Sequence, residues 1–94
     1  MGLRVREVEH AFANKLRAER DSAGHHIYFY LNHEGSQYTV GKLSHSWKGD
    51  LNDTQVMMLA SRLHLRKREF ERFVDCDLEA REVLGLWWRR RNLA

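Results

Sequence analysis

The order of secondary-structure signals along the chain predicts an α+β fold with one small antiparallel sheet. Residues 25–45 hold two runs rich in aromatic and β-branched side chains, separated by turn residues, and this pattern is typical of a β-hairpin. Apolar residues at helical spacing precede the hairpin and follow it over several segments. One helix, a hairpin and then two or three further helices indicate a sheet that is covered on one side.

The first helix is expected over residues 3–15. Val5, Val8 and Phe12 recur there at helical spacing, with charged residues between them. Residues 17–22 are open to two interpretations, because their propensities favour more helix while a short strand would also fit. The sheet therefore has either two or three strands.

The hairpin follows directly. Residues 25–31 read as its first strand, residues 32–36 as its turn and residues 37–45 as its second strand. Gly35 supplies the positive φ that a tight turn needs. Gly41 interrupts the second strand, since glycine inside a strand weakens it and often marks a bulge.

Three helices are expected after the hairpin. Asn52 has the features of an N-cap, with a glutamine three residues later, and it begins a helix that runs to about Leu65. A third helix is predicted over about 67–75 and a fourth over about 78–91, with Asp77 as the cap of the fourth. These segments complete a single domain, 1–94.

The length and composition of the chain limit the classes of function that it can have. A chain of 94 residues fits one domain, since domains commonly run from ~50 to ~250 residues. The net charge of +3 favours a polyanionic partner, and the sole cysteine, Cys76, suits a reducing compartment. No apolar run resembles a signal peptide or approaches the ~20 residues that cross a bilayer. We therefore expect a cytoplasmic protein with no membrane partner.

The first strand of the hairpin divides into two faces, because side chains alternate along a strand. The odd positions are apolar after the first and predict the covered face, whereas the even positions predict the open face. The odd set is His25, Ile27, Phe29 and Leu31, and the even set is His26, Tyr28 and Tyr30.

Two registers are compatible with the turn. A two-residue turn would pair Phe29 with Val40, and a three-residue loop would pair Phe29 with Gly41. Both registers place His25 and His45 at the open end of the hairpin, opposite or adjacent to one another. A histidine site is therefore predicted at that end.

The stretches AGHHIYFYL and YTVGKLSH resemble the HicA-type toxins of bacterial toxin–antitoxin systems, which show a Gly-Ser-His-His-like start to one strand and a Thr-Val-Pro-His-like end to the next. The longer stretch GKLSHSWKGDLNDTQVMMLASRLHL also resembles a group of small HicA-like proteins. The resemblance covers residues 1–65 as a core, chiefly from Val5 to Leu65, and leaves 66–94 as a C-terminal helical extension. It implies a fold like that of a double-stranded-RNA-binding domain, with a helix, three strands and a helix.

The resemblance also implies an activity. Members of the family cleave mRNA without a metal or cofactor, use one histidine and are neutralised by a HicB-type antitoxin protein. Laid on this chain, the catalytic position is His25, and His45 ends the last strand. Strand alternation instead places His26 on the open face, so both neighbours are candidates, and a bulge at Gly24 would reconcile the two expectations.

The chemistry asked of the histidine is proton transfer. A neutral imidazole can take the proton of an RNA 2′-hydroxyl, whose oxygen then attacks the adjacent phosphorus. Candidates for binding or protonating the phosphate are Lys42, His45 and Lys48, and candidates for stacking on bases are Tyr28, Tyr30 and Trp47. The alternative is a non-catalytic RNA-binding or protein-interaction module on the same fold.

Two other interpretations of the histidines and of the basic runs compete with an RNA site. A zinc site from His25, His26, His45 and Cys76 matches no known ligand spacing, so no metal is expected. The basic runs 62–68 and 87–91 are more typical of solvated helix faces than of phosphate contacts.

Overall fold

The chain forms an N-terminal helix, a three-stranded antiparallel sheet and three further helices, as the computed structural model describes for residues 3–75 and 77–93. This confirms the α+β prediction. The elements are α1 (Val5–His10), the π-helical turn η1 (Ala11–Lys15), β1 (Glu19–Ala23), β2 (His26–His33), β3 (Ser36–Ser44), α2 (Asp53–Arg62), α3 (Lys67–Val74) and α4 (Ala80–Leu93).

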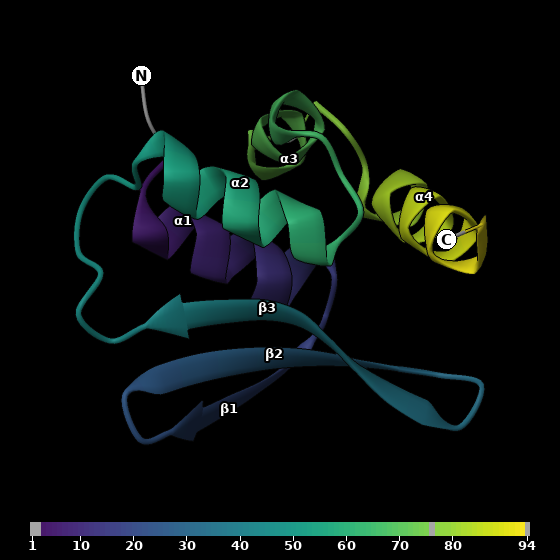
Figure 1. Cartoon of the computed structure of the whole chain (residues 1–94), viewed down its shortest axis with the longest axis horizontal. Helices are drawn as coiled ribbons and strands as arrows, with labels where there is room; N and C mark the ends of the chain where they lie inside the picture. The colour runs from purple at the N-terminus through teal and green to yellow at the C-terminus, as the bar shows by residue number, and fades with distance from the viewer. Residues whose placement is uncertain (1–2, 76, 94) are drawn as a thin grey trace.

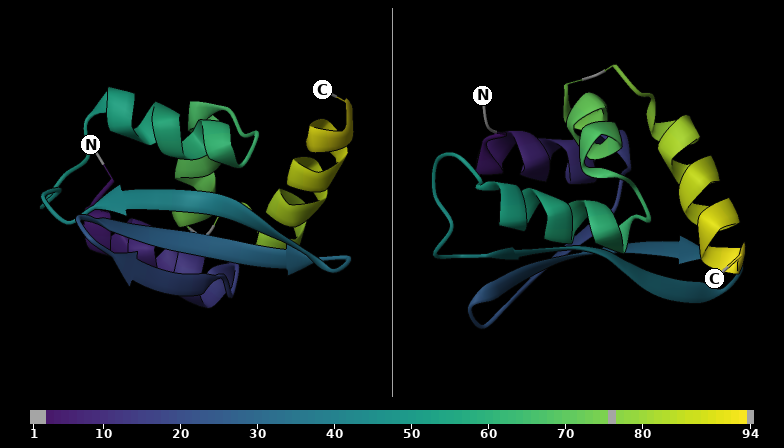
Figure 2. Two further views of the ribbon diagram at one scale, coloured as in Figure 1. Left: turned by 60° about the horizontal axis from the view of Figure 1, so that its bottom comes forward. Right: turned by 45° about the horizontal axis from the view of Figure 1, so that its top comes forward.

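Helices cover one face of the sheet and leave the other uncovered. α1, α2 and α3 lie on the covered side (Figure 1), and the left view of Figure 2 looks onto the opposite side of the strands. α4 stands apart from these three, beside the tip of the β2–β3 hairpin. None of the helices in the described part of the chain is long and apolar enough to cross a membrane.

Of residues 17–22, those from Glu19 on form a strand rather than more helix. β1 pairs with β2 in antiparallel fashion, from Glu19 opposite Tyr30 to Ala23 opposite His26. The turn between them is Gly24-His25, and Gly24 has a φ of +60°. Glycine at the first position of a two-residue turn suits the tight connection that matches the twist of paired strands. His25 thus belongs to a turn, and β2 begins one residue later than predicted.

The tip of the β2–β3 hairpin is the predicted two-residue turn. Glu34 and Gly35 both have positive φ, 50° and 82°, which is the geometry of the turn favoured between paired strands. Just behind it Leu31 pairs with Tyr38, as the two-residue turn requires.

The base of the same hairpin follows the other register. A bulge between Phe29 and Tyr30 leaves Val40 as the extra residue of β3, and from there on Phe29 pairs with Gly41 and Ile27 with Leu43. Each of the two predicted registers therefore holds for one half of the hairpin. The strand itself continues through Gly41, so the expectation that this glycine interrupts it was wrong. The bulge that a glycine in a strand often marks is present beside it, at Val40.

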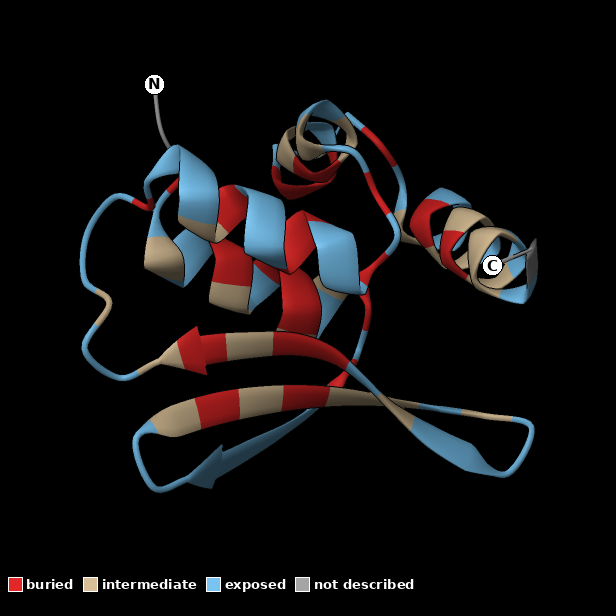
Figure 3. Ribbon diagram, viewed as in Figure 1, coloured by how far each residue is buried: buried red, intermediate tan, exposed pale blue. Residues whose placement is uncertain are grey.

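The core lies between the sheet and the helices, where Figure 3 shows buried segments on the facing surfaces of β2, β3, α1 and α2. Four phenylalanines from three elements are fully buried there: Phe12 of η1, Phe29 of β2, and Phe70 and Phe73 of α3. Phe12 is central, since its ring stacks on Phe29 at 5.0 Å and lies 6.1 Å from Phe70. The ring of Phe12 also covers Gly41, where an added Cβ would come within 2.8 Å of it.

The alternation predicted for β2 is confirmed. Ile27 and Phe29 are buried, whereas Tyr28 and Tyr30 are half-buried on the other face. Burying the odd positions against the helices is favourable, at roughly 1.5–3 kcal/mol for a fully buried large apolar side chain. The even positions are thereby directed to the uncovered face.

The start of α2 is as predicted and the start of α4 is not. Asn52 accepts a hydrogen bond from the backbone N–H of Gln55, and the Gln55 side chain accepts one from the backbone N–H of Asn52, each at 2.8 Å. Asp77 does not cap α4, because the helix begins only at Ala80. The carboxylate of Asp77 instead accepts a hydrogen bond from Arg72 Nε at 3.3 Å.

Large side chains of α4 fasten it to the hairpin tip. Trp87 is buried and lies edge-on to Tyr38 at 5.4 Å, and Trp88 lies 4.1 Å from the ring of His33. The guanidinium of Arg91 stacks over Tyr38 at 4.2 Å. Side chains of the run 87–91 therefore anchor α4 to the tip of the β2–β3 hairpin, and α4 belongs to the same folded unit.

Arg90 joins α4 to α3 through a paired contact. It donates two hydrogen bonds to Glu69, of 2.7 and 3.0 Å, and a third to the carbonyl of His64. These bonds, with the backbone N–H of Arg66, lower the pKa of Glu69 from 4.5 to about 2, although burial opposes the shift. A two-pronged contact of this kind positions the helix as well as stabilising it.

We expect this contact to make the fold sensitive to acid. Because the folded pKa of Glu69 lies below the unfolded one, its stabilisation is complete above pH ~4.5 and is lost as the pH falls toward 2. Urea unfolding should show the wild type about 1–2 kcal/mol more stable than Glu69→Gln at pH 6, allowing for solvent screening. The difference should shrink at pH 2.5. A gap that stays constant over this range would contradict the assignment.

Candidate functional site

A small cavity of about 140 Å³ opens where the base of the hairpin meets α2. Its walls combine one histidine, two cationic side chains, an aromatic ring and an exposed methionine. The lining residues are His26, Lys42, Ser44, Trp47, Met58, Leu59 and Arg62. Three of them, His26, Lys42 and Trp47, were predicted as site residues from the sequence.

Strand pairing brings the polar side chains of this cavity together. His26 lies opposite Ser44, and Tyr28 lies opposite Lys42 on the neighbouring pair of the same face. The ammonium of Lys42 sits 5.9 Å from the centre of the Tyr28 ring, close enough for a cation–π contact. The bulge makes this possible, because in the two-residue-turn register Lys42 would oppose Ile27 and face the core.

The other wall comes from α2, where the buried Leu59 lies beside the exposed Met58 and Arg62. Leu59 and Arg62 are three residues apart and Met58 and Arg62 are four apart, so all three share one helix surface. Met58 is 57% exposed, an unusual position for so large an apolar side chain. Sequence reasoning missed Ser44, Met58 and Arg62. Only the place of Arg62 at the start of a basic run hinted at a role.

The two other predicted histidines lie away from this cavity. His45 donates its backbone N–H to the carbonyl of His25 at 2.9 Å, which confirms that both stand at the open end of the hairpin. The Nε2 of His45 lies 3.0 Å from Ser22 Oγ. Ser22 pairs with Ile27 on the covered side of the sheet. His25 is exposed in the β1–β2 turn.

Trp47 stands between two hollows. It is half-buried, lines the cavity of His26, and also lines a second cavity of about 460 Å³ that contains Lys48, Arg4 and Arg6. Lys48 is therefore beside the predicted site rather than in it. Glu9 and Asp50 also line this second cavity, and Asp50 lies 3.8 Å from Arg4, so its charge is mixed.

An aromatic row extends from the cavity along the uncovered face. The rings of His26 and Tyr28 are 6.0 Å apart, and those of Tyr28 and Tyr30 are 6.2 Å apart and nearly parallel. The two edges of the row differ in charge. Lys42 borders it on β3, while β1 places Asp21 opposite Tyr28 and Glu19 opposite Tyr30.

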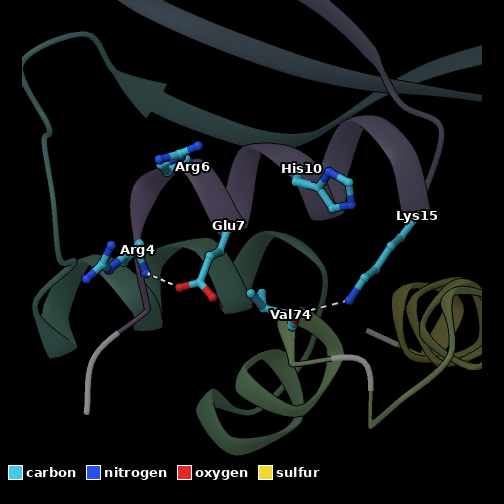
Figure 4. Close-up of a pocket in the computed structure, with 6 residues that line it drawn as sticks. All are labelled: Arg4, Arg6, Glu7, His10, Lys15 and Val74. Carbon is cyan, nitrogen blue, oxygen red and sulfur yellow. Dashed lines mark hydrogen bonds between the residues drawn. The ribbon is translucent and has the colours of Figure 1, made fainter.

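The cavity drawn in Figure 4 is larger, about 540 Å³, and among the described residues all of its polar side chains except that of Arg6 have partners. The ammonium of Lys15 donates to the carbonyls of Phe73 and Val74, at 2.8 and 2.9 Å, and so caps the end of α3. Glu7 accepts from the backbone N–H of Arg4 at 3.0 Å. Lys15 thus joins η1 to α3, and Glu7 holds the residue before α1, so both side chains have a structural role.

Within residues 3–75 and 77–93, no three histidine, cysteine, aspartate or glutamate side chains gather as metal ligands would. The zinc alternative included Cys76, which lies outside the described residues. The side chains of the His26 cavity offer a proton acceptor, two cations and stacking surfaces. That set can hold a phosphodiester next to a base and take a proton from a neighbouring hydroxyl.

No protein-family model matches this chain, and no curated protein or solved structure matches it either. What the site can do therefore follows from its side chains and their arrangement.

Proposed function

We propose that the protein is a metal-independent endoribonuclease that acts on single-stranded RNA in the His26 cavity. One observation carries the proposal: His26, Lys42 and Arg62 line the same small cavity, from β2, β3 and α2. A histidine flanked by two cations suits RNA cleavage, because the 2′-hydroxyl provides the nucleophile and the phosphate needs charge neutralisation. The net charge of +3 is consistent with an RNA substrate.

The reaction we propose is an internal transfer. The imidazole of His26 takes the 2′-hydroxyl proton, and the 2′-oxygen bonds to phosphorus. The bond from phosphorus to the 5′-oxygen of the next nucleotide breaks, and that oxygen is protonated by Lys42 or by water. Lys42 and Arg62 neutralise the phosphate oxygens throughout. The products are a 2′,3′-cyclic phosphate and a 5′-hydroxyl.

The arrangement of the first elements supports a relation to HicA-type toxins. α1, the three strands and α2 follow in the order that the family's double-stranded-RNA-binding-like fold requires. We propose that fold for the chain, mRNA as the substrate and a HicB-type protein as the partner. The resemblance indicates His25 as the base. We assign that role to His26 because it shares a cavity with cations, whereas His25 lies in an exposed turn.

The first test is cleavage by the purified protein. We expect a single-stranded RNA to be cut in the presence of EDTA, with cyclic phosphate ends, while DNA of the same sequence stays intact because it lacks the 2′-hydroxyl. Mass spectrometry of the fragments identifies the ends. Equal cutting of DNA, or cutting that EDTA stops, would exclude the proposed reaction.

A second candidate is RNA binding without cleavage. It is favoured by one observation: within the described ranges, the ring of His26 has no hydrogen-bond partner that would orient it as a base. This candidate predicts that RNA stays intact, and that the logarithm of the affinity falls linearly with the logarithm of the salt concentration.

A further inference from the structure

A groove of about 470 Å³ lies at the far end of the aromatic row, where β2 passes the start of β1 and α4. Tyr30 belongs to both the row and the groove, so the two surfaces are continuous. Around Tyr30 the groove gathers Glu19 and Asn32 from the same sheet face, Arg17 from the segment before β1, and Trp88 from α4. The groove therefore combines ring surface with a polar edge and a cation.

The amide of Asn32 is oriented. Its Nδ2 donates to Glu19 Oε1 at 3.0 Å, and because a carboxylate only accepts, the nitrogen and the oxygen of the amide are identified. Among the hydrogen bonds of the described residues, the second N–H and the carbonyl oxygen of Asn32 have no partner, so both remain for a ligand. A donor beside an acceptor matches adenine, whose N7 accepts a hydrogen bond and whose N6 amino group donates one.

We infer that this groove binds an unpaired adenine of the RNA strand that enters the His26 cavity. The base stacks on Tyr30, and its edge pairs with Asn32. The inference rests on the proposed function, since it supplies a second contact for the same RNA. His26 and Tyr30 are four residues apart on β2, about 13 Å at ~3.3 Å per residue, so the two contacts require a strand of several nucleotides.

Charge sets the path of the backbone between the two contacts. Asp21 and Glu19 border the row on β1 and repel phosphates, whereas Lys42 borders it on β3. The phosphates therefore follow β3 and the bases point toward β1, where carboxylates accept hydrogen bonds from amino groups.

The test uses oligonucleotides that cannot be cut. Fluorescence anisotropy with labelled 2′-O-methyl hexamers should show oligoadenylate binding about 5- to 100-fold more tightly than oligouridylate. Asn32→Ala should remove this preference and leave the affinity for oligouridylate unchanged. Gln37→Ala is the matched control, because Gln37 is the exposed cross-strand partner of Asn32 outside the groove, and it should keep the preference.

Tyr30→Ala should weaken the binding of both oligonucleotides, since stacking does not depend on the base. Equal affinity of the wild type for the two hexamers, or a preference that persists in Asn32→Ala, overturns the adenine site. Failure here is separable from failure of the proposed function. An adenine preference without RNA cleavage would retain the groove and remove the nuclease, and cleavage without preference would do the reverse.

Discussion

Substituting His26→Ala is expected to slow RNA cleavage by about 10²- to 10⁴-fold, the usual contribution of a positioned general base. His26 is half-buried on the uncovered face, so its removal leaves the core untouched, and RNA should still bind through Lys42 and Arg62. The loss should therefore be in kcat rather than in KM. Initial rates on a fluorogenic RNA, with binding measured separately, distinguish the two.

The matched control is His25→Ala. His25 is the neighbouring residue, exposed in the turn, and its backbone carbonyl rather than its ring holds His45. On the geometry of the cavity we expect this variant to retain most of the activity. If instead His25→Ala is inactive and His26→Ala is active, the base belongs to the turn, as the resemblance to HicA-type toxins implies, and the cavity serves only to bind RNA.

The Gly41→Ala substitution is expected to destabilise the fold by about 1–3 kcal/mol, as overpacking of a close-packed core does. The added Cβ would lie 2.8–3.1 Å from three ring carbons of Phe12. That ring cannot retreat, because Phe29 and Phe70 enclose it. For a domain of this size the melting temperature should fall by about 5–20 °C, which thermal unfolding followed by circular dichroism would measure.

Gly85→Ala provides a control of opposite sign. Gly85 is exposed in α4, and a Cβ added there meets nothing within 4 Å. Alanine favours a helix by about 0.8–1 kcal/mol over glycine, so the melting temperature should rise by several degrees. If both glycine variants moved it in the same direction, contact with Phe12 would not be the cause of the Gly41 effect.

Local patterns predicted the parts of the fold that depend on local physics. The alternation of Ile27 and Phe29 with Tyr28 and Tyr30 follows from strand geometry alone, and the cap at Asn52 is made by residues three positions apart. The proximity of two histidines at the open end of the hairpin was also predictable, because it holds in either register.

The remaining features depend on contacts between distant residues. Two registers had equal local support, and the base of β3 adopts the one that sets Gly41 against Phe12, from another element. The approach of Arg62 to His26 depends on where α2 lies beside the sheet, which no periodicity specifies. The predicted cap at Asp77 had a sound local pattern, yet its carboxylate binds Arg72 instead.

The bulge at Val40 determines which change in the length of β3 keeps the strand pairing. Before the bulge Tyr38 faces Trp87, and after it Lys42 faces the uncovered side of the sheet. The extra residue thus reverses the side-chain alternation between the two ends of β3, which contact different surfaces. Deleting Val40 would remove the extra residue and leave the partners and faces of both ends as they are. The cost of that deletion should therefore come from the loss of the buried Val40 side chain and not from inverted faces.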